Sequence, residues 1–367
     1  MTPLRVDALG LKFLPLIAEA WLLEGELLRE LGKVKEAESA LLEAVVAADA
    51  SQDDSARARA ALQLTITVGL RSGRVEAGEH WGQLATGTLQ RLGQPDELMG
   101  LLWSTMGALS ESQGKSQEAM QRYERSLAAR ERALGPNSYL VGYTLNNLGV
   151  TATSLGEFKR AGEALERALT LQRADLGEGH PALSSPLTNL GTLRVREGDP
   201  DAGLALHEQA EALSRNALGP THPQVAIALE NEAEALLQLG RWAEAEERSG
   251  KALQIFDARF PEGQSAHVYI LTARGEALIE LGRVSEAVAA LERGLKILEL
   301  NPSPPELTAR LHYFLARGLR QSGGDRARVS ELATRAQQEL PAHVTDLELP
   351  GKISTMLRSS EGADGGR

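Results

Sequence analysis

Gly114-Lys115-Ser116 is the first group of residues whose order suggests chemistry, because glycine, lysine and serine in this order end a phosphate-binding loop. That loop also needs a glycine five residues earlier and a β-strand before it. Position 109 holds Leu109, and the flanking sequence has helical spacing. The sequence therefore predicts an ordinary turn between two helices at this point.

The histidines are the next candidates. His207-Glu208 begins like the zinc-binding helix of a metalloprotease, but Glu211 stands where the second histidine ligand is needed. His180 and His222 lie 42 residues apart, and each directly precedes a proline. Repetition in register favours a structural role, in which each histidine hydrogen-bonds its own turn. A ligand contact at the edge of the molecule is the alternative.

No other arrangement of residues indicates catalysis. The chain has no cysteine, no Gly-x-Ser-x-Gly sequence and no Gly-x-Gly-x-x-Gly sequence that follows a strand. The sequence therefore predicts neither an enzyme nor a site for a metal or a cofactor. A hidden hydrolase or a sensor of a small ligand is the least favoured alternative.

Length and charge narrow the classes of protein further. A chain of 367 residues exceeds the ~250–300 residues of one compact core, so it forms two globular domains or grows by repetition. Lys+Arg 39 against Asp+Glu 50 gives 39 − 50 = −11, which is the wrong sign for a general binder of nucleic acid or anionic membranes. No apolar run approaches the ~20 residues of a membrane span, and residues 1–13 do not resemble a secretory signal. A cytoplasmic location is expected.

A glycine that recurs along almost the whole chain determines the predicted fold. The successive spacings are 41 or 42 residues, and the positions, called here the register glycines, are Gly32, Gly73, Gly114, Gly156, Gly198, Gly240, Gly282 and Gly323. Small residues recur seven positions before these glycines and large apolar residues recur eleven positions before them. Such columns are typical of packed helices, and a glycine can end a helix in a left-handed conformation. Each repeat is therefore predicted to be a pair of antiparallel helices.

The motif Leu-Gly-x-x-x-Glu-Ala, seen in residues 31–37 and 281–287, resembles the tetratricopeptide (TPR) repeat. The long period and the turns at 134–138, 176–181 and 218–223 resemble the kinesin-light-chain type of this family. This resemblance implies an all-α, right-handed superhelical solenoid of about eight helix-turn-helix repeats. It also implies a concave groove lined by the first helix of each pair.

The expected organisation has four segments. Residues 1–17 are the remnant of a preceding repeat or an N-terminal cap, 18–340 are eight repeats of 41–42 residues, 341–358 form a C-terminal capping helix, and 359–367 are a disordered tail. The helix pairs should begin near Ala18, Ser55, Glu97, Tyr139, Ala182, Pro223, Gln264 and Pro305. Val6 to Gly10 look like the end of an earlier repeat, which would make the array part of a longer protein. Similar arrays form the C-terminal half of large bacterial serine/threonine kinases, and this comparison is a resemblance only.

Three asparagines in successive repeats are the first candidates for binding. Asn147, Asn189 and Asn231 stand nine residues before their register glycines, where the family uses asparagine to hydrogen-bond the backbone of a bound peptide. An amide both donates and accepts, so it can bind an extended chain whatever its side chains are. The alternative, that these amides pair with the backbone of the neighbouring repeat, stays open.

The predicted groove contains further candidates with aromatic or charged side chains. Tyrosines expected to point inward are Tyr143, Tyr269 and Tyr313, and the cluster Glu234, Glu276 and Glu280 would attract a basic peptide. Arg196 and Arg317 would flank this acidic cluster. The basic residues with which chaperone-binding TPR domains hold a terminal carboxylate are not at matching positions.

These expectations favour a non-catalytic scaffold for protein–protein interaction that binds a peptide or a partner helix in its groove. A regulatory or docking module of a bacterial signalling protein is the expected context. The competing hypothesis is a self-association module, in which apolar surface on an end repeat stacks on another chain.

Overall fold

The computed structural model describes residues 10, 12–260, 265–300, 304–340 and 349–361. The chain divides into two units, residues 1–177 and 178–367, and each is described by itself. Within the described residues all regular structure is helical, and no strand occurs. None of the described helices is both long enough and apolar enough to cross a lipid bilayer.

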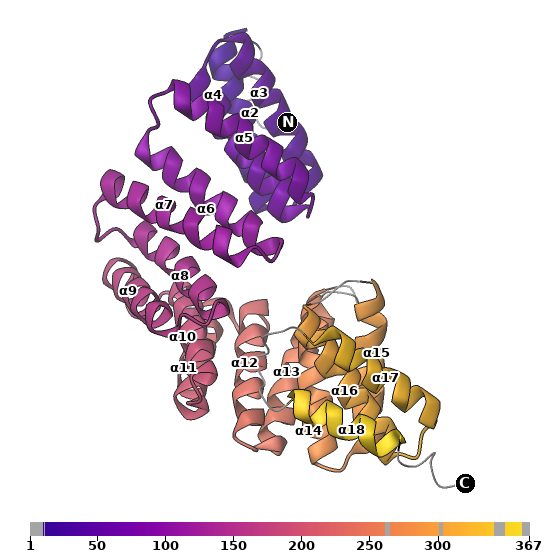
Figure 1. Ribbon diagram of the computed structural model, residues 1–367. Helices are drawn as coiled ribbons and strands as arrows, with labels where there is room; N and C mark the ends of the chain where they lie inside the picture. The colour runs from indigo at the N-terminus through magenta and orange to yellow at the C-terminus, as the bar shows by residue number, and fades with distance from the viewer. Residues whose placement is uncertain (1–9, 11, 261–264, 301–303, 341–348, 362–367) are drawn as a thin grey trace. The chain divides into compact units, whose positions relative to one another are not determined.

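The first unit contains four helix pairs (Figure 1). The helices are α2 (Leu14–Glu30), α3 (Val34–Ala50), α4 (Asp54–Leu64) continued by the π-helix η1 (Thr65–Arg71), α5 (Val75–Arg91), α6 (Asp96–Ser112), α7 (Ser116–Leu134), α8 (Tyr139–Ser154) and α9 (Phe158–Leu176). Each helix packs on the next one along the chain, and α4 also packs on α2 and α6. The first helix of each pair thus forms one layer and the second helix forms the other.

The second unit repeats this arrangement. Its helices are the 3₁₀ turn η2 (Pro181–Leu183), α10 (Ser184–Arg196), α11 (Pro200–Leu218), α12 (Pro223–Gln238), α13 (Trp242–Arg259), α14 (Ser265–Glu280), α15 (Val284–Leu300), α16 (Pro305–Gln321), α17 (Arg326–Glu339) and α18 (Leu349–Glu361). The helices α10, α12, α14 and α16 pack side by side as the inner layer, and α11, α13, α15 and α17 form the outer one. The predicted all-α stack of eight helix pairs is confirmed.

The helix boundaries lie close to the predicted ones. All eight pairs begin within four residues of their expected starts, and the largest difference is at α2, which begins at Leu14 with Pro15 in its first turn. A proline is well accommodated there, because its missing N–H would have no helical partner. The predicted C-terminal helix is α18, which begins at Leu349 and continues to Glu361. Residues 1–9, 11, 341–348 and 362–367 lie outside the described part of the chain.

The register glycines end their helices as predicted. All eight have positive φ, between 69° and 88°. At Gly156, the next amide, that of Glu157, donates to the carbonyl of Ala152 over 2.9 Å, which closes a Schellman turn. A residue that has a side chain is strained at such a φ. The position of the glycine therefore determines where the first helix of each pair ends.

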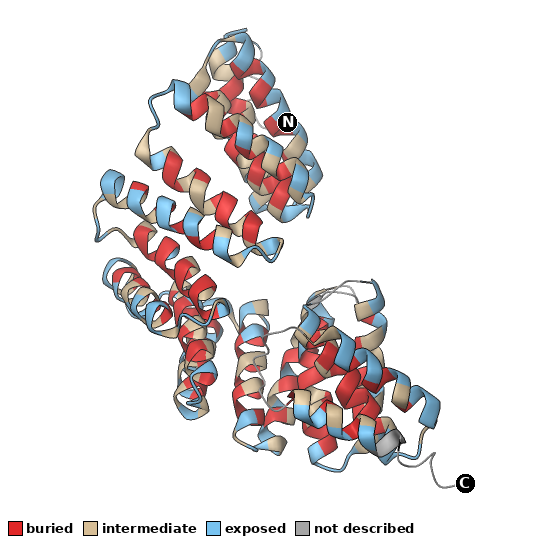
Figure 2. Cartoon of the chain, viewed as in Figure 1, coloured by how far each residue is buried: buried red, intermediate tan, exposed pale blue. Residues whose placement is uncertain are grey.

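The two helices of a pair approach closely because a bulky side chain of the second helix sits on a glycine of the first. Leu41 lies on Gly25, Tyr123 on Gly107, Leu165 on Gly149, His207 on Gly191 and Leu291 on Gly275. The glycine column was predicted from the sequence. The bulky partners, each nine residues after a register glycine, were not identified. They are buried, and buried residues alternate with exposed ones along each helix (Figure 2).

The second repeat departs from this pattern. Ile66 stands where other repeats carry glycine or alanine, seven residues before the register glycine. Here the chain forms the π-helix η1, and Gly69 instead approaches the partner helix at Gly78. A π-turn holds one extra residue and rotates those that follow, which brings a residue without a side chain to the contact.

Candidate functional site

Arg310 defines the inner face of the second unit. Its guanidinium, on α16, donates to Glu276 of α14 over 3.0 Å and to Glu234 of α12 over 2.7 Å. The helices α12 and α16 are separated by α14 in the stack, so one side chain can reach both only where the inner helices converge. This face is therefore concave, as predicted for the first helices of the pairs.

The predicted acidic cluster is already paired within the chain. Glu234 and Glu276 share Arg310, and Glu280 pairs with Arg317 over 2.5 Å. The expectation that these three carboxylates would be free to attract a basic peptide is therefore corrected, because two arginines of α16 offset most of their charge. Arg310 was missed in the sequence, although it stands thirteen residues before its register glycine, at the same register position as Tyr143 and Tyr269.

The asparagines differ in how their amides are used. Asn231 donates from Nδ2 to the carbonyl of Ile227 in its own helix over 2.8 Å, and Thr192 of α10 donates to its Oδ1 over 3.5 Å. This amide thus bonds to its own helix and to a neighbouring side chain, and not to the backbone of the neighbouring repeat. Asn189 on α10 is half-buried and has a contact within the chain. Asn147 is half-buried on α8 of the first unit.

Tyr143 and Tyr269 are the exposed aromatic residues of the predicted set. Tyr143 is 41% exposed and packs edge-on against Tyr139, and Tyr269 is 40% exposed on α14. Ile227, 46% exposed on α12, occupies the same register position and was not singled out from the sequence. An exposed side chain of this size at the same position of three inner helices provides apolar contact area on the inner faces.

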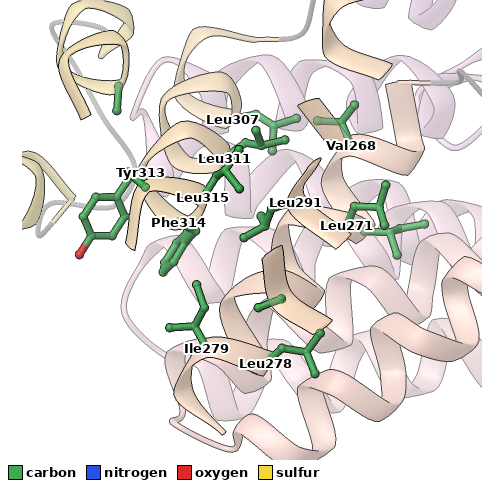
Figure 3. Close-up of a cluster of buried hydrophobic side chains, with 14 of the residues drawn as sticks. Val268, Leu271, Leu278, Ile279, Leu291, Leu307, Leu311, Tyr313, Phe314 and Leu315 are labelled. Atoms are coloured by element: carbon green, nitrogen blue, oxygen red, sulfur yellow. The ribbon is translucent and has the colours of Figure 1, made fainter. Parts of the chain in front are cut away.

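Tyr313 corrects the prediction that three tyrosines point inward. Only 6% of it is exposed, and its ring packs edge-on against Phe314 at a centroid distance of 5.0 Å. Figure 3 shows this ring at the edge of the aliphatic cluster of α14, α15 and α16, with its hydroxyl directed away from the aliphatic side chains. Leu349, Ile353 and Met356 of α18 complete the same core, so Tyr313 serves packing.

Glu230 was also missed by the sequence reading. It lies on α12 at helical spacing from Ile227, Asn231 and Glu234, so these four side chains share one face. Burial and, to a smaller extent, the neighbouring charge of Glu234 raise the pKa of Glu230, and Arg310 opposes both effects, so that the pKa is about 8. Part of the Glu230 residue stays accessible to solvent. The carboxyl group therefore loses water because of the curved inner face around it and not because it is fully enclosed.

Arg196 lies at the C-terminal end of α10. Its side chain is exposed, yet the surrounding protein lowers the pKa of its guanidinium by partial loss of water, and Glu306 of α16 opposes this shift. The charge of Glu306 on α16 thus acts on Arg196 of α10. Arg317 is bound by Glu280.

Models of the tetratricopeptide repeat match residues 98–174, 143–215 and 182–258, and a second model of this repeat matches residues 5–55. Together these stretches cover more than half of the chain. The chain belongs to the tetratricopeptide repeat family. A comparison with curated proteins gave no match.

Solved structures show the same TPR fold. The apo form of RapI has a TM-score of 0.60 at 12% identity and covers 95% of this chain and 99% of its own. A Signal Transduction ATPase with Numerous Domains from Pyrococcus horikoshii, which has a tetratricopeptide repeat sensor, has a TM-score of 0.59 at 13% identity, over 92% of this chain and 50% of its own. BtubC (BKLC) from P. vanneervenii has a TM-score of 0.50 at 21% identity, over 67% of this chain and 95% of its own.

The histidines that precede prolines have the predicted structural role in the TPR turns. The Nδ1 of His180 accepts a hydrogen bond from the Ala182 amide, and that of His222 accepts one from the Gln224 amide, both over 3.2 Å. Each histidine thus caps the start of a first helix. Gly114 is, as predicted, part of the turn between α6 and α7, with a φ of 72°.

The described residues of the TPR array hold no group of three or more potential metal-ligating side chains. A cavity of about 400 Å³ opens between α16 and α18, and it is lined by Tyr313, Arg320, Gly351, Lys352, Thr355 and Met356. The curvature of stacked TPR repeats itself creates an extended concave surface, which is the part of such arrays that binds partner proteins.

Proposed function

We propose that this TPR array is a non-catalytic scaffold that binds a peptide or a partner helix on the inner faces of its units. The observation that carries the proposal is the shared register of Tyr143, Ile227 and Tyr269, each about two-fifths exposed on an inner helix. Large apolar side chains that are exposed at one repeated position form apolar surface that remains accessible to a partner after folding. Asn147, half-buried on α8, would add an amide beside Tyr143.

The context of this binding is proposed to be docking or sensing within a bacterial, cytoplasmic signalling system. The support for a signalling role is the shared fold with the Pyrococcus signal transduction ATPase, which has a tetratricopeptide repeat sensor. The division into a terminal segment 1–17, an array 18–340, a capping helix and a tail is proposed with it.

A selection from random peptides tests the binding proposal. Dodecapeptides displayed on phage are selected on the full chain, and the affinities of the enriched peptides are measured by fluorescence anisotropy. Replacing Ile227 and Tyr269 together by serine should weaken binding about tenfold or more, because a few large side chains near the centre of an interface carry most of the binding energy. Leu300→Ser is the matched control, since Leu300 is 77% exposed on the outer helix α15.

The control variant should bind like the unchanged protein. If the inner-face double variant also binds every selected peptide with unchanged affinity, the inner face of the second unit is not the binding surface.

Self-association is the second candidate function, and Leu27 favours it. Five residues before the register glycine, Val68, Leu109 and Leu193 are buried, whereas Leu27 is 49% exposed and the nearby Leu31 is 70% exposed. Leu109 packs on Gly69 of the preceding repeat, which is the contact that Leu27 lacks among the described residues. A second copy of the chain would bury this surface.

Sedimentation over a concentration series tests self-association. We expect the unchanged chain to show a concentration-dependent mass and Leu27→Glu to shift it to the monomer, because burying an unpaired carboxylate at an interface opposes association. Leu281→Glu is the control, since Leu281 precedes its register glycine as Leu31 does but lies inside the array. A monomeric mass at the highest concentration would exclude this function.

A further inference from the structure

Glu230 is a carboxyl group on the inner face of the second unit that has no hydrogen-bond or ion-pair partner among the described residues. Among the described residues, Glu234, Glu276 and Glu280 are held by arginines, whereas no hydrogen bond or ion pair to Glu230 is formed. It shares its face of α12 with the exposed Ile227. Burial raises the pKa of the Tyr269 phenol on α14, and the charge of Glu230 lies close enough to raise this pKa as well. A carboxyl group thus stands beside two exposed apolar side chains.

The groups around Glu230 leave a negative potential on this part of the inner face. Its own helix contributes Glu234, α14 contributes Tyr269 and Glu276, and α16 contributes Glu306 and Arg310. Arg310 is engaged by two other carboxylates, and Arg196 of α10 acts on Glu306. Another carboxyl group of α12, that of Glu232, lies on the side of the helix opposite to Glu230. The charged residues that act on it are Glu208, Glu211, Arg215 and Arg248. Carboxylates therefore outnumber cations around Glu230.

We infer that the inner face of the second unit recognises a partner segment that places an apolar side chain on Ile227 and Tyr269 and an arginine or lysine on Glu230. The inference rests on the proposed binding function and names the chemistry of the partner. Charge complementarity is its basis, because an arginine brought to Glu230 gains a carboxyl group that forms no ion pair with the described residues. Apolar contact supplies the remaining affinity.

This recognition depends on pH. With a pKa of about 8, Glu230 is mostly protonated and neutral at pH 7 in the free protein. A bound cation favours the carboxylate form, so it lowers this pKa, and binding releases a proton. Affinity therefore rises with pH. A tenfold preference for the ionised form corresponds to a one-unit drop of the pKa and to binding about fivefold tighter at pH 8 than at pH 6.

The test uses the same dodecapeptides selected from phage display on the full chain. We expect the enriched peptides to carry arginine or lysine close to an aromatic or aliphatic residue. Replacing that arginine by citrulline, which is neutral and of similar shape, should weaken binding to the unchanged protein about tenfold at pH 8. Glu230→Gln should bind both peptides equally and lose the dependence on pH. Glu247→Gln, on the outer helix α13, is the control and should behave like the unchanged protein.

The outcomes separate the two proposals. If peptides bind and are sensitive to Ile227→Ser and Tyr269→Ser, but citrulline or Glu230→Gln has no effect, the groove function stands and the role of Glu230 is refuted. If no selected peptide is sensitive to the apolar variants, the groove function fails and the inference fails with it. Circular dichroism of Glu230→Gln confirms that the fold is retained, since the change keeps the size of the side chain.

Discussion

Replacing His207 by leucine is expected to remove about 2 kcal/mol of destabilisation that α10 and α11 of the second unit otherwise undergo between pH 7.5 and pH 5. His207 is 1% exposed, and burial lowers its pKa from 6.5 to about 4. Because this base is harder to protonate in the folded state, its contribution is fully present above pH 6.5. It is lost as the pH falls toward 4. The full shift corresponds to about 3 kcal/mol, and about 2 kcal/mol of it is lost between pH 7.5 and pH 5.

Leucine fits this place because the chain already uses it there. Leu41, Leu165 and Leu291 hold the same register position, each on a glycine of the partner helix. The Nδ1 of His207 has no hydrogen-bond partner among the described residues, so its removal breaks no hydrogen bond at this buried atom. Urea denaturation at pH 7.5 and pH 5, with hydrogen exchange of the α10–α11 amides, measures the effect locally, because repeat arrays need not unfold in one step.

The converse change provides the control. Leu165→His places a histidine on Gly149 in the first unit, and it should create a new loss of stability below pH 6.5 there. If His207→Leu denatures with the same dependence on pH as the unchanged chain, the buried histidine is not the acid-sensitive group.

Replacing Gly149 by alanine should destabilise the first unit by about 2 kcal/mol, despite the better helix propensity of alanine. A Cβ at Gly149 would lie 2.4 Å from Cγ of Leu165, which is fully buried. The atom in the way is the branch point of a packed side chain, so the two helices have to separate or the leucine has to leave its rotamer. Thermal denaturation monitored by circular dichroism measures the loss.

Two further variants distinguish this contact from a general effect of glycine replacement. Gly87→Ala, in helix α5 of the same unit, meets no atom within 4 Å and should stabilise by about 0.5–1 kcal/mol. Leu165→Ser added to Gly149→Ala copies the pair Ala233 and Ser249, both buried in another repeat, and should restore part of the lost stability. Equal effects of Gly87→Ala and Gly149→Ala would show that the close contact is not the cause.

The carboxylate proposed to attract a basic partner differs from the three expected from the sequence, for a physical reason. The column that holds Glu234 and Glu276 was found by counting from the register glycines, and the prediction of a basic partner followed from their charge. Arg310 lies 34 residues beyond Glu276 and 76 beyond Glu234, so its pairing with both appears only when three repeats are stacked. Glu230, which has no ion-pair partner among the described residues, is therefore the carboxyl group that we propose attracts a cation.

The sequence by itself determined the repeat, the positions at which helices end and the layer to which each helix belongs. These follow from local physics, because glycine tolerates positive φ, proline suits a first turn and apolar spacing decides which face is buried. The tertiary structure alone decided which polar side chains remain available: it paired Glu234, Glu276 and Glu280, turned the amide of Asn231 to its own helix and packed Tyr313 into the core. It also exposed Ile227 and set His207 on Gly191. Most of these outcomes depend on contacts between residues of different helices, and the curvature that brings those residues together accumulates over several repeats.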